Sequence, residues 1–308
     1  MTPVIPRIDG VLAPVVTPFG ADHAPDATRF IRHCRWLVAN GVGLAVFGTN
    51  SEANSLAAPE RMELLEKVVA AGVDPARMMP GAGMCAVTDS ARLAAHATKL
   101  GCAGVLMLPP FYYKGVSDEG LYRNYAEIIE RVGDARLRIY LYHIPQVTQV
   151  PISLALIERL RKDFADVVVG IKDSSGDWAN AQAMLDRFAP GGFDVFVGSE
   201  SLLLANMRGG GKGCISATAN VNAHAIAGLH RDWQRADADA QQAALDRVRA
   251  IFQRHPMIPA LKAAVAHWSR IPDWRTVRPP LVELDPAQSA ALVSELEQAG
   301  FSMPGLNA

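Results

Sequence analysis

Short apolar runs alternate with longer amphipathic stretches along most of this chain. Eight such runs lie at 11–19, 44–48, 78–83, 104–109, 138–144, 167–172, 194–199 and 213–219. Most of the runs are continuously apolar, which is typical of parallel strands covered on both faces. A run followed by an amphipathic stretch recurs roughly every 30 residues, as expected for βα units.

The amphipathic stretches carry helix start and stop signals. The sequence predicts helices over 59–72, 88–101 and 117–133. Each begins with residues that favour the first positions of a helix, and each ends at a glycine. In the second of these, we expect Thr88 or Asp89 to cap the helix.

Eight βα units predict an α/β protein with a (β/α)8 TIM barrel over residues 1–224. Residues 225–308 are almost entirely helical in pattern and predict a C-terminal helical region packed on the barrel. The alternative is an open doubly wound sheet, which needs a glycine-rich turn after an early strand. The first glycine pair, at 41 and 43, precedes its strand instead.

Composition narrows the class of protein. Of 308 residues, 50% are hydrophobic and 20% charged, so the chain can bury a large core. The formal charge of −1 argues against a nucleic-acid or anionic-membrane partner, because both bind proteins with a basic excess. Apolar runs are far shorter than the ~18–20 residues of a membrane span.

The N-terminal residues and the cysteines indicate the cellular compartment in which we expect the protein. The first ten residues lack a basic region followed by an apolar one, so no secretory signal is expected. The four cysteines are scattered and form no CxxC pair. They predict reduced thiols in the cytoplasm, without a disulfide framework or a metal site.

In such a barrel, the functional residues lie at the carboxyl ends of the strands. That rule selects Thr49, Asn50, Tyr142, Lys172, Ser199, Glu200 and Ser216. Lys172 is the sharpest candidate, since it closes an apolar run in a chain with seven lysines. Partial desolvation disfavours an ammonium, and a neutral amine can attack a ketone to form a Schiff base. From position alone, a lysine that merely extends to the surface is equally consistent.

Two further features lie at strand ends. Tyr142 could exchange protons with a carbonyl or imine, although an isolated tyrosine more often packs at the edge of a core. His143 alternates to the other face of its strand, so we expect packing rather than catalysis. Residues 48–52 form a turn of small polar residues that can offer N–H groups to a carboxylate, or can simply make a turn.

Together these segments resemble the dihydrodipicolinate synthase / N-acetylneuraminate lyase family of class I aldolases. The resemblance runs in order over nearly the whole chain, through GVLAPVVTPF, FGTNSE, LPPFYYKGVSDEGLY, YLYHIP, GIKDSSGD, FVGSES and GGGKGCISATANV. It implies a barrel with C-terminal helices, a homotetramer built as a dimer of dimers, and no metal or organic cofactor. It also implies a Schiff-base-forming lyase that acts on pyruvate or a pyruvate-derived 2-oxo acid.

The resemblance assigns roles to individual residues. Lys172 matches the imine-forming lysine and Tyr142 the proton-transferring tyrosine. Thr49 matches the threonine that relays protons and helps to hold the carboxylate, with Asn50, Ser199, Glu200 and Ser216 as expected substrate-binding neighbours. The family also sends a tyrosine across a subunit interface. Counting from the paired prolines selects Tyr112, which we prefer, and counting back from EGLY selects Tyr113.

Departures from the family pattern bear on the substrate. Lysine-pathway synthases carry a carboxylate-binding arginine where this chain has Val147. Asn50 replaces a threonine, and Glu200 is followed by Ser201 where the sialic-acid enzymes have a second acid. We therefore expect cleavage, condensation or dehydration of another 2-oxo acid. The alternatives are a genuine 4-hydroxy-tetrahydrodipicolinate synthase, a catalytically silent keto-acid-binding relative, and a metal-dependent aldolase, which would need clustered ligands.

Overall fold

The computed structural model describes residues 7–306 and divides the chain into two compact units. Of the described residues, 7–9 and 74–214 form the first unit, and 10–73 and 215–306 form the second. The predicted boundary near residue 224, between a barrel and a helical region, stays a prediction.

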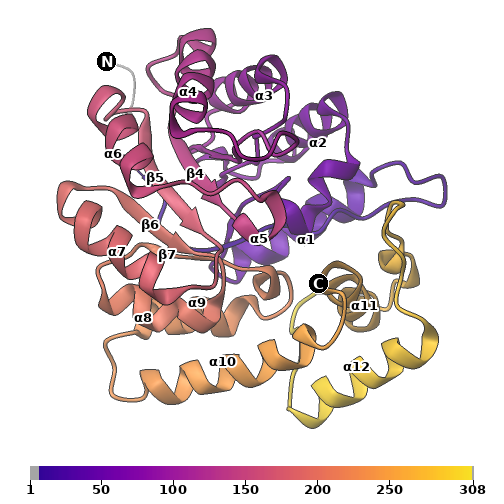
Figure 1. The fold of residues 1–308 in the computed structure, drawn as a ribbon. Coiled ribbons are helices and arrows are strands. Elements are labelled where there is room, and N and C mark those ends of the chain that lie inside the picture. The colour runs from indigo at the N-terminus through magenta and orange to yellow at the C-terminus, as the bar shows by residue number, and fades with distance from the viewer. Residues whose placement is uncertain (1–6, 307–308) are drawn as a thin grey trace. The chain divides into compact units, whose positions relative to one another are not determined.

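The first unit holds a parallel sheet. Its strands are β3 (Val105–Met107), β4 (Ile139–His143), β5 (Val168–Asp173), β6 (Asp194–Val197) and β7 (Gly213–Ile215), of which β7 ends at the border of the unit. Strands that follow one another in the chain are neighbours and parallel. Helix α3 (Val87–Lys99) precedes β3, and the helices between the strands are α4 (Asp118–Val132), α5 (Pro145–Thr148), α6 (Leu154–Asp163), α7 (Trp178–Phe188) and α8 (Leu203–Arg208) (Figure 1). The predicted βα repeat is confirmed here.

The strands of this unit are buried along their whole length, as expected for parallel strands covered on both faces. Gly170 in β5 shows how tightly the sheet is filled. A Cβ at this position would lie 2.5 Å from Tyr140 Cδ1 and 2.6 Å from the carbonyl oxygen of Asp194. Only glycine therefore allows this segment of β5, two residues before Lys172, to approach both neighbours.

The predicted run at 78–83 is the one run that does not contain a strand. It still lies parallel to β3, because Leu106 N donates to Pro80 O at 2.9 Å and Ala82 N donates to Leu106 O at 2.8 Å. A single bridge joins Gly81 to Leu106. Pro80 has no N–H to extend this ladder, so the pairing stays too short to form a strand.

The second unit contains β1 (Gly10–Ala13) and β2 (Gly43–Leu44), which pair in parallel. The chain that leaves β7 continues beside β1, since Ser216 N donates to Leu12 O at 3.1 Å. The helices are α1 (Ala27–Ala39), α2 (Ala58–Ala70), α9 (Ala223–Asp232), α10 (Ala238–Gln253), α11 (Met257–Ser269) and α12 (Pro286–Gln298). Helices α10, α11 and α12 pack against one another (Figure 1), and the predicted C-terminal helices are confirmed.

Helix ends follow the sequence signals in one case and depart from them in another. Helix α4 begins after Ser117, whose hydroxyl accepts a hydrogen bond from Gly120 N at 3.2 Å, and ends at Gly133 in the left-handed region. The prediction that Thr88 or Asp89 caps α3 is wrong, because the helix begins at Val87 and its N-cap residue is Ala86. None of the helices within residues 7–306 is both long and apolar enough to cross a membrane.

Candidate active site

Lys172 and Tyr142 are the centre of the candidate site. They occupy directly paired positions on the neighbouring parallel strands β5 and β4, so their side chains leave the sheet on the same face. The Lys172 Nζ atom lies 4.1 Å from the centroid of the Tyr142 ring. Lys172 is 2% exposed and Tyr142 3% exposed. A buried amine and a phenol are thus in contact at the carboxyl end of the sheet.

The surroundings of Lys172 leave its amine available for chemistry. Within the described part of the first unit, the only polar or ring contact of the Lys172 amine is the Tyr142 ring. No carboxylate forms an ion pair with it there. An amine held in this way can attack a carbonyl carbon without first breaking an ion pair.

The loop after Lys172 is fixed by Asp173, which sequence reasoning did not select. Its Oδ1 accepts a hydrogen bond from Ser175 N at 2.9 Å, and its Oδ2 accepts one from Asn180 Nδ2 at 3.0 Å. Ser174 N donates to His143 O at 2.8 Å, which ties the loops after β5 and β4 together. The signal was present in the sequence, because an aspartate two residues before a serine is typical of an Asx turn.

His143 packs on the other face of β4, as the alternation of the strand predicts. Its side chain is buried, and Nδ1 accepts a hydrogen bond from Ile152 N at 3.1 Å. Burial lowers the pKa of His143, and the negative charge of Asp173 opposes that shift. The residue therefore anchors the chain after α5 and does not face the Lys172–Tyr142 pair.

Ser199 and Glu200 lie after β6, the strand next to β5. The Ser199 hydroxyl accepts a hydrogen bond from Ser201 N at 3.2 Å and caps a 3₁₀ turn, Glu200–Leu202. Glu200 is 1% exposed. This loop approaches the loop after β5 closely, because a Cβ on Gly198 would lie 2.0 Å from Ser174 Oγ. Both predicted residues thus sit at the same end of the first unit as Lys172 and Tyr142.

Three predicted residues belong to the second unit. Thr49 and Asn50 are half-buried in a 3₁₀ turn, Thr49–Ser51, that follows β2. Ser216 follows β7 and is fully buried; its hydroxyl accepts a hydrogen bond from Arg249 Nη1 at 3.1 Å. Glu52, directly after the turn, is also buried, and sequence reasoning did not identify it as part of the site.

The two interface-tyrosine candidates lie on the surface of the first unit. Tyr112 is 74% exposed and Tyr113 72% exposed, and their rings meet edge to face at 5.3 Å. Lys114 holds this segment, donating to Phe111 O and, at 2.7 Å, to Thr148 O of α5. Neither tyrosine is anchored in the core of its own chain.

The position where lysine-pathway synthases carry an arginine is also exposed. Val147 in α5 is 57% exposed. Arg123 of α4 pairs with Glu119 of the same helix at 2.6 Å and points to solvent, so it does not replace the missing cation. Among residues 7–306, no cluster of three or more His, Cys, Asp or Glu side chains could hold a metal ion.

Known proteins resemble this chain over almost its whole length. A sequence model described as the Dihydrodipicolinate synthetase family matches residues 7–299. The "Uncharacterized DapA-like lyase" of Chloroflexus aurantiacus is 32% identical over 292 residues, which are 94% of this chain and 96% of that protein.

Solved structures agree with this similarity. Dihydrodipicolinate synthase from Agrobacterium tumefaciens str. C58 superimposes with a TM-score of 0.87 at 30% identity, covering 95% of this chain and 99% of that one. YagE from E. coli K12, a prophage protein solved in complex with pyruvate, gives a TM-score of 0.86 at 27% identity and covers 96% and 99%. These likenesses confirm the predicted (β/α)8 barrel with C-terminal helices.

Proposed function

We propose a function from the premise that this chain belongs to the dihydrodipicolinate synthetase family and is a lyase of the class I aldolase type. The Lys172 amine attacks the C2 carbonyl of pyruvate, or of a pyruvate-derived 2-oxo acid. The resulting carbinolamine loses water to give an imine between Nζ and C2. The observation that carries this proposal is the buried contact between the Lys172 amine and the Tyr142 ring, 4.1 Å apart.

Tyr142 is the proton carrier of this proposal. Loss of water from the carbinolamine needs a proton on the departing hydroxyl, and the C3 carbon must lose a proton to become an enamine. A phenol on the strand beside the imine can donate the first proton and accept the second. By the family resemblance, Thr49 relays protons from Tyr142, and in this proposal it carries away the proton that Tyr142 takes from C3. The solved pyruvate complex of YagE supports pyruvate as the imine partner.

The enamine carbon then makes or breaks a bond to a second substrate. Val147 and Asn50 favour a partner without a second carboxylate at this end of the site, since a valine cannot pair with an anion. Glu200 and Ser199 offer a buried acid and a hydroxyl beside β5, which suits a hydroxylated partner. We therefore propose cleavage, condensation or dehydration of a 2-oxo acid other than that of the lysine pathway.

A genuine 4-hydroxy-tetrahydrodipicolinate synthase is the second candidate. The likeness to the Agrobacterium tumefaciens enzyme, at 30% identity, favours it. The exposed Val147 argues against it, because nothing at that position can hold the carboxylate of aspartate semialdehyde.

The assembly and compartment follow from the same premise. We propose a cytoplasmic homotetramer, a dimer of dimers, in which Tyr112 completes the proton relay of a neighbouring subunit. The 74% exposure of Tyr112 supports this role, since its ring finds no cover within its own unit. Cys34, Cys85 and Cys102 are free thiols, consistent with a reducing compartment.

Reduction with borohydride tests the proposed imine. The protein is incubated with pyruvate and borohydride, and its intact mass is measured. We expect one reduced pyruvate adduct per chain, and no adduct in Lys172→Arg, whose guanidinium is not nucleophilic. An unmodified wild-type protein, with pyruvate and with a panel of other 2-oxo acids, would instead favour the catalytically silent relative.

A further inference from the structure

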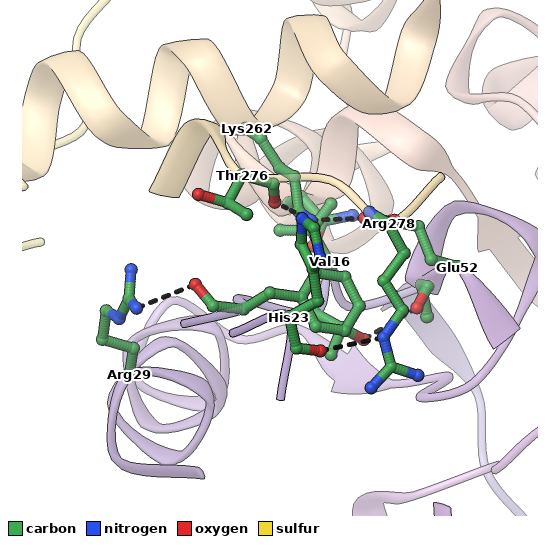
Figure 2. Close-up of polar contacts among 11 residues, drawn as sticks. Val16, His23, Arg29, Glu52, Lys262, Thr276 and Arg278 are labelled. Carbon is green, nitrogen blue, oxygen red and sulfur yellow. Dashed lines mark hydrogen bonds and ion pairs between the residues drawn. The ribbon is translucent and has the colours of Figure 1, made fainter. Parts of the chain in front are cut away.

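The second unit contains another buried lysine, Lys262. The side chain of Lys262, on α11, has 0% exposure, as does that of Glu52. Lys262 Nζ donates to Glu52 Oε1 and, at 2.7 Å, to Thr276 O, and it lies 4.4 Å from the centroid of the Phe19 ring (Figure 2). All three ammonium hydrogens thus have an acceptor or a ring face.

Burial lowers the pKa of Lys262 to about 8, against the pull of the Glu52 carboxylate. Lys262 is therefore mostly protonated at neutral pH. A buried ion pair adds little stability compared with well-packed apolar side chains. Stability alone therefore does not explain why an ion pair occupies this position.

Glu52 has an unusual backbone conformation. Its φ of +56° lies in the left-handed region, where a side chain other than glycine is strained. Its N–H donates to Thr49 O at 3.1 Å and closes the 3₁₀ turn that carries Thr49 and Asn50. Its second carboxylate oxygen accepts a hydrogen bond from Arg278 N at 2.9 Å. Two anchors from the C-terminal segment thus hold the residue that sets the geometry of the turn.

Arg278, whose backbone N–H holds Glu52, also binds the segment that follows the turn through its side chain. Its Nη1 donates to Ser55 O at 2.7 Å and to Glu60 Oε2 at 2.8 Å. Its Nε donates to His23 O at 2.9 Å (Figure 2). The chain that follows Thr49 is therefore fastened by α11 and by the segment after α11, whereas Thr49 itself is only half-buried.

We propose that Lys262 is a positioning residue for the reaction, which holds Glu52 in the left-handed conformation and thereby fixes Thr49 for proton transfer. This role rests on the proposed function, because Thr49 matters only if protons move at the imine. Lys262 touches no substrate. It acts through Glu52, and its effect falls on proton transfer and not on imine formation.

Two double variants separate this role from simple packing. Lys262→Met/Glu52→Gly and Lys262→Met/Glu52→Ala both remove the ion pair and leave no unpaired buried charge. They differ by a single Cβ, and glycine adopts the left-handed conformation freely whereas alanine resists it. We measure exchange of the pyruvate methyl protons with D2O by NMR, which reports proton transfer. Borohydride trapping on Lys172 and thermal unfolding are measured in the same samples.

We expect both variants to be trapped with pyruvate at rates within about threefold of wild type. We expect exchange to be roughly tenfold slower in the alanine variant than in the glycine variant, because small misplacements of a catalytic group are costly. Equal exchange rates in the two variants would overturn the proposal, as would wild-type exchange in the alanine variant. Wild-type protein that is never trapped would refute the proposed function instead.

One further variant covers the case in which the first two do not fold, and another is a matched control. Lys262→Met/Glu52→Gln keeps the acceptor for Arg278 N, and its amide can donate to the Thr276 carbonyl that Lys262 leaves. If the glycine and alanine variants do not fold, this one should still be trapped but exchange about tenfold more slowly than wild type. The matched control is Lys67→Met/Glu63→Gln, which removes an exposed pair on α2, 2.6 Å apart, and should leave both rates unchanged.

Discussion

Two of the seven lysines are almost completely buried, and their surroundings differ in kind. Lys262 is held by a carboxylate, a carbonyl and a ring face, so every hydrogen of its ammonium is engaged. Lys172 contacts the face of a phenol within its unit. Reaction with a carbonyl needs an amine that can leave its partners, and only Lys172 meets that condition. Burial alone therefore does not distinguish the proposed nucleophile, Lys172, from the proposed positioning residue, Lys262.

At the residue scale, Tyr142 offers a direct test of proton transfer. A positioned acid–base group contributes roughly 10²–10⁴-fold to a rate. Tyr142→Phe keeps the ring against Lys172 and removes only the hydroxyl, so turnover should fall by about that factor while substrate affinity changes little. Steady-state kinetics together with pyruvate binding by calorimetry check both parts. A variant that turns over at a rate near that of wild type would exclude the role.

Val147 provides a prediction about the second substrate. With a valine, condensation of pyruvate with aspartate semialdehyde should be poor. Val147→Arg should raise kcat/KM for this aldehyde by roughly tenfold, the effect of one charge-assisted pair at a half-exposed position. Val147→Leu is the matched control without charge. Efficient condensation by the wild-type protein would restore the lysine-pathway function.

The contact between Lys172 and Tyr142 could be predicted from the sequence, whereas the ion pair of Glu52 and Lys262 could not. Lys172 and Tyr142 each close an apolar run, and parallel strands bring such ends together. Glu52 and Lys262 are 210 residues apart, and no local pattern relates them. Their partnership depends on how α11 packs against the turn after β2, which propensities and periodicity do not specify. The same holds for Ser216, whose hydroxyl faces Arg249 of α10.

At the scale of elements, apolar runs located the strands better than they defined their lengths. The runs at 138–144 and 167–172 contain β4 and β5 almost residue for residue. The run at 78–83 takes a strand position beside β3, but Pro80 limits its ladder to isolated pairing. Capping was less predictable, because α3 begins at Val87, after Ala86, without a side-chain cap. The hydrophobic pattern therefore predicts the architecture, whereas tertiary contacts determine the local geometry of polar groups.

Helix α1 carries a buried histidine that should make stability depend on pH. His33 stacks on Trp36 and meets Trp274 edge to face, and burial lowers its pKa from 6.5 to about 4. Between pH 6.5 and 4 the unfolded chain binds a proton that the folded chain does not. The contribution is therefore complete above pH 6.5 and is lost as the pH falls, amounting to about 3 kcal/mol.

Urea unfolding at pH 7 and pH 4.5 measures this dependence. His33→Phe keeps an aromatic ring between the two tryptophans and cannot titrate. Its free energy of unfolding should fall by about 2 kcal/mol less than that of wild type over this interval, because the other titrating groups are shared. Identical losses in the two proteins would show that His33 is not held neutral.

At the scale of the whole molecule, the proposal that Tyr112 serves a neighbouring subunit predicts that one chain is not the active unit. Tyr112→Phe should reduce turnover by roughly 10²-fold, because it removes a member of the neighbouring relay. Tyr113→Phe, the adjacent and equally exposed ring, is the matched control and should change turnover little. Sedimentation velocity should find a dimer or a larger species at assay concentrations. A fully active monomer would contradict a relay shared between subunits.

The most direct test of the account asks which lysine carries the substrate. Wild-type protein is reduced with borohydride in the presence of pyruvate, digested, and its peptides are sequenced by mass spectrometry. The reduced adduct should lie on Lys172 alone, because Lys262, the other buried amine, is locked to Glu52. An adduct on Lys262 or on an exposed lysine, with Lys172 unmodified, would contradict the account.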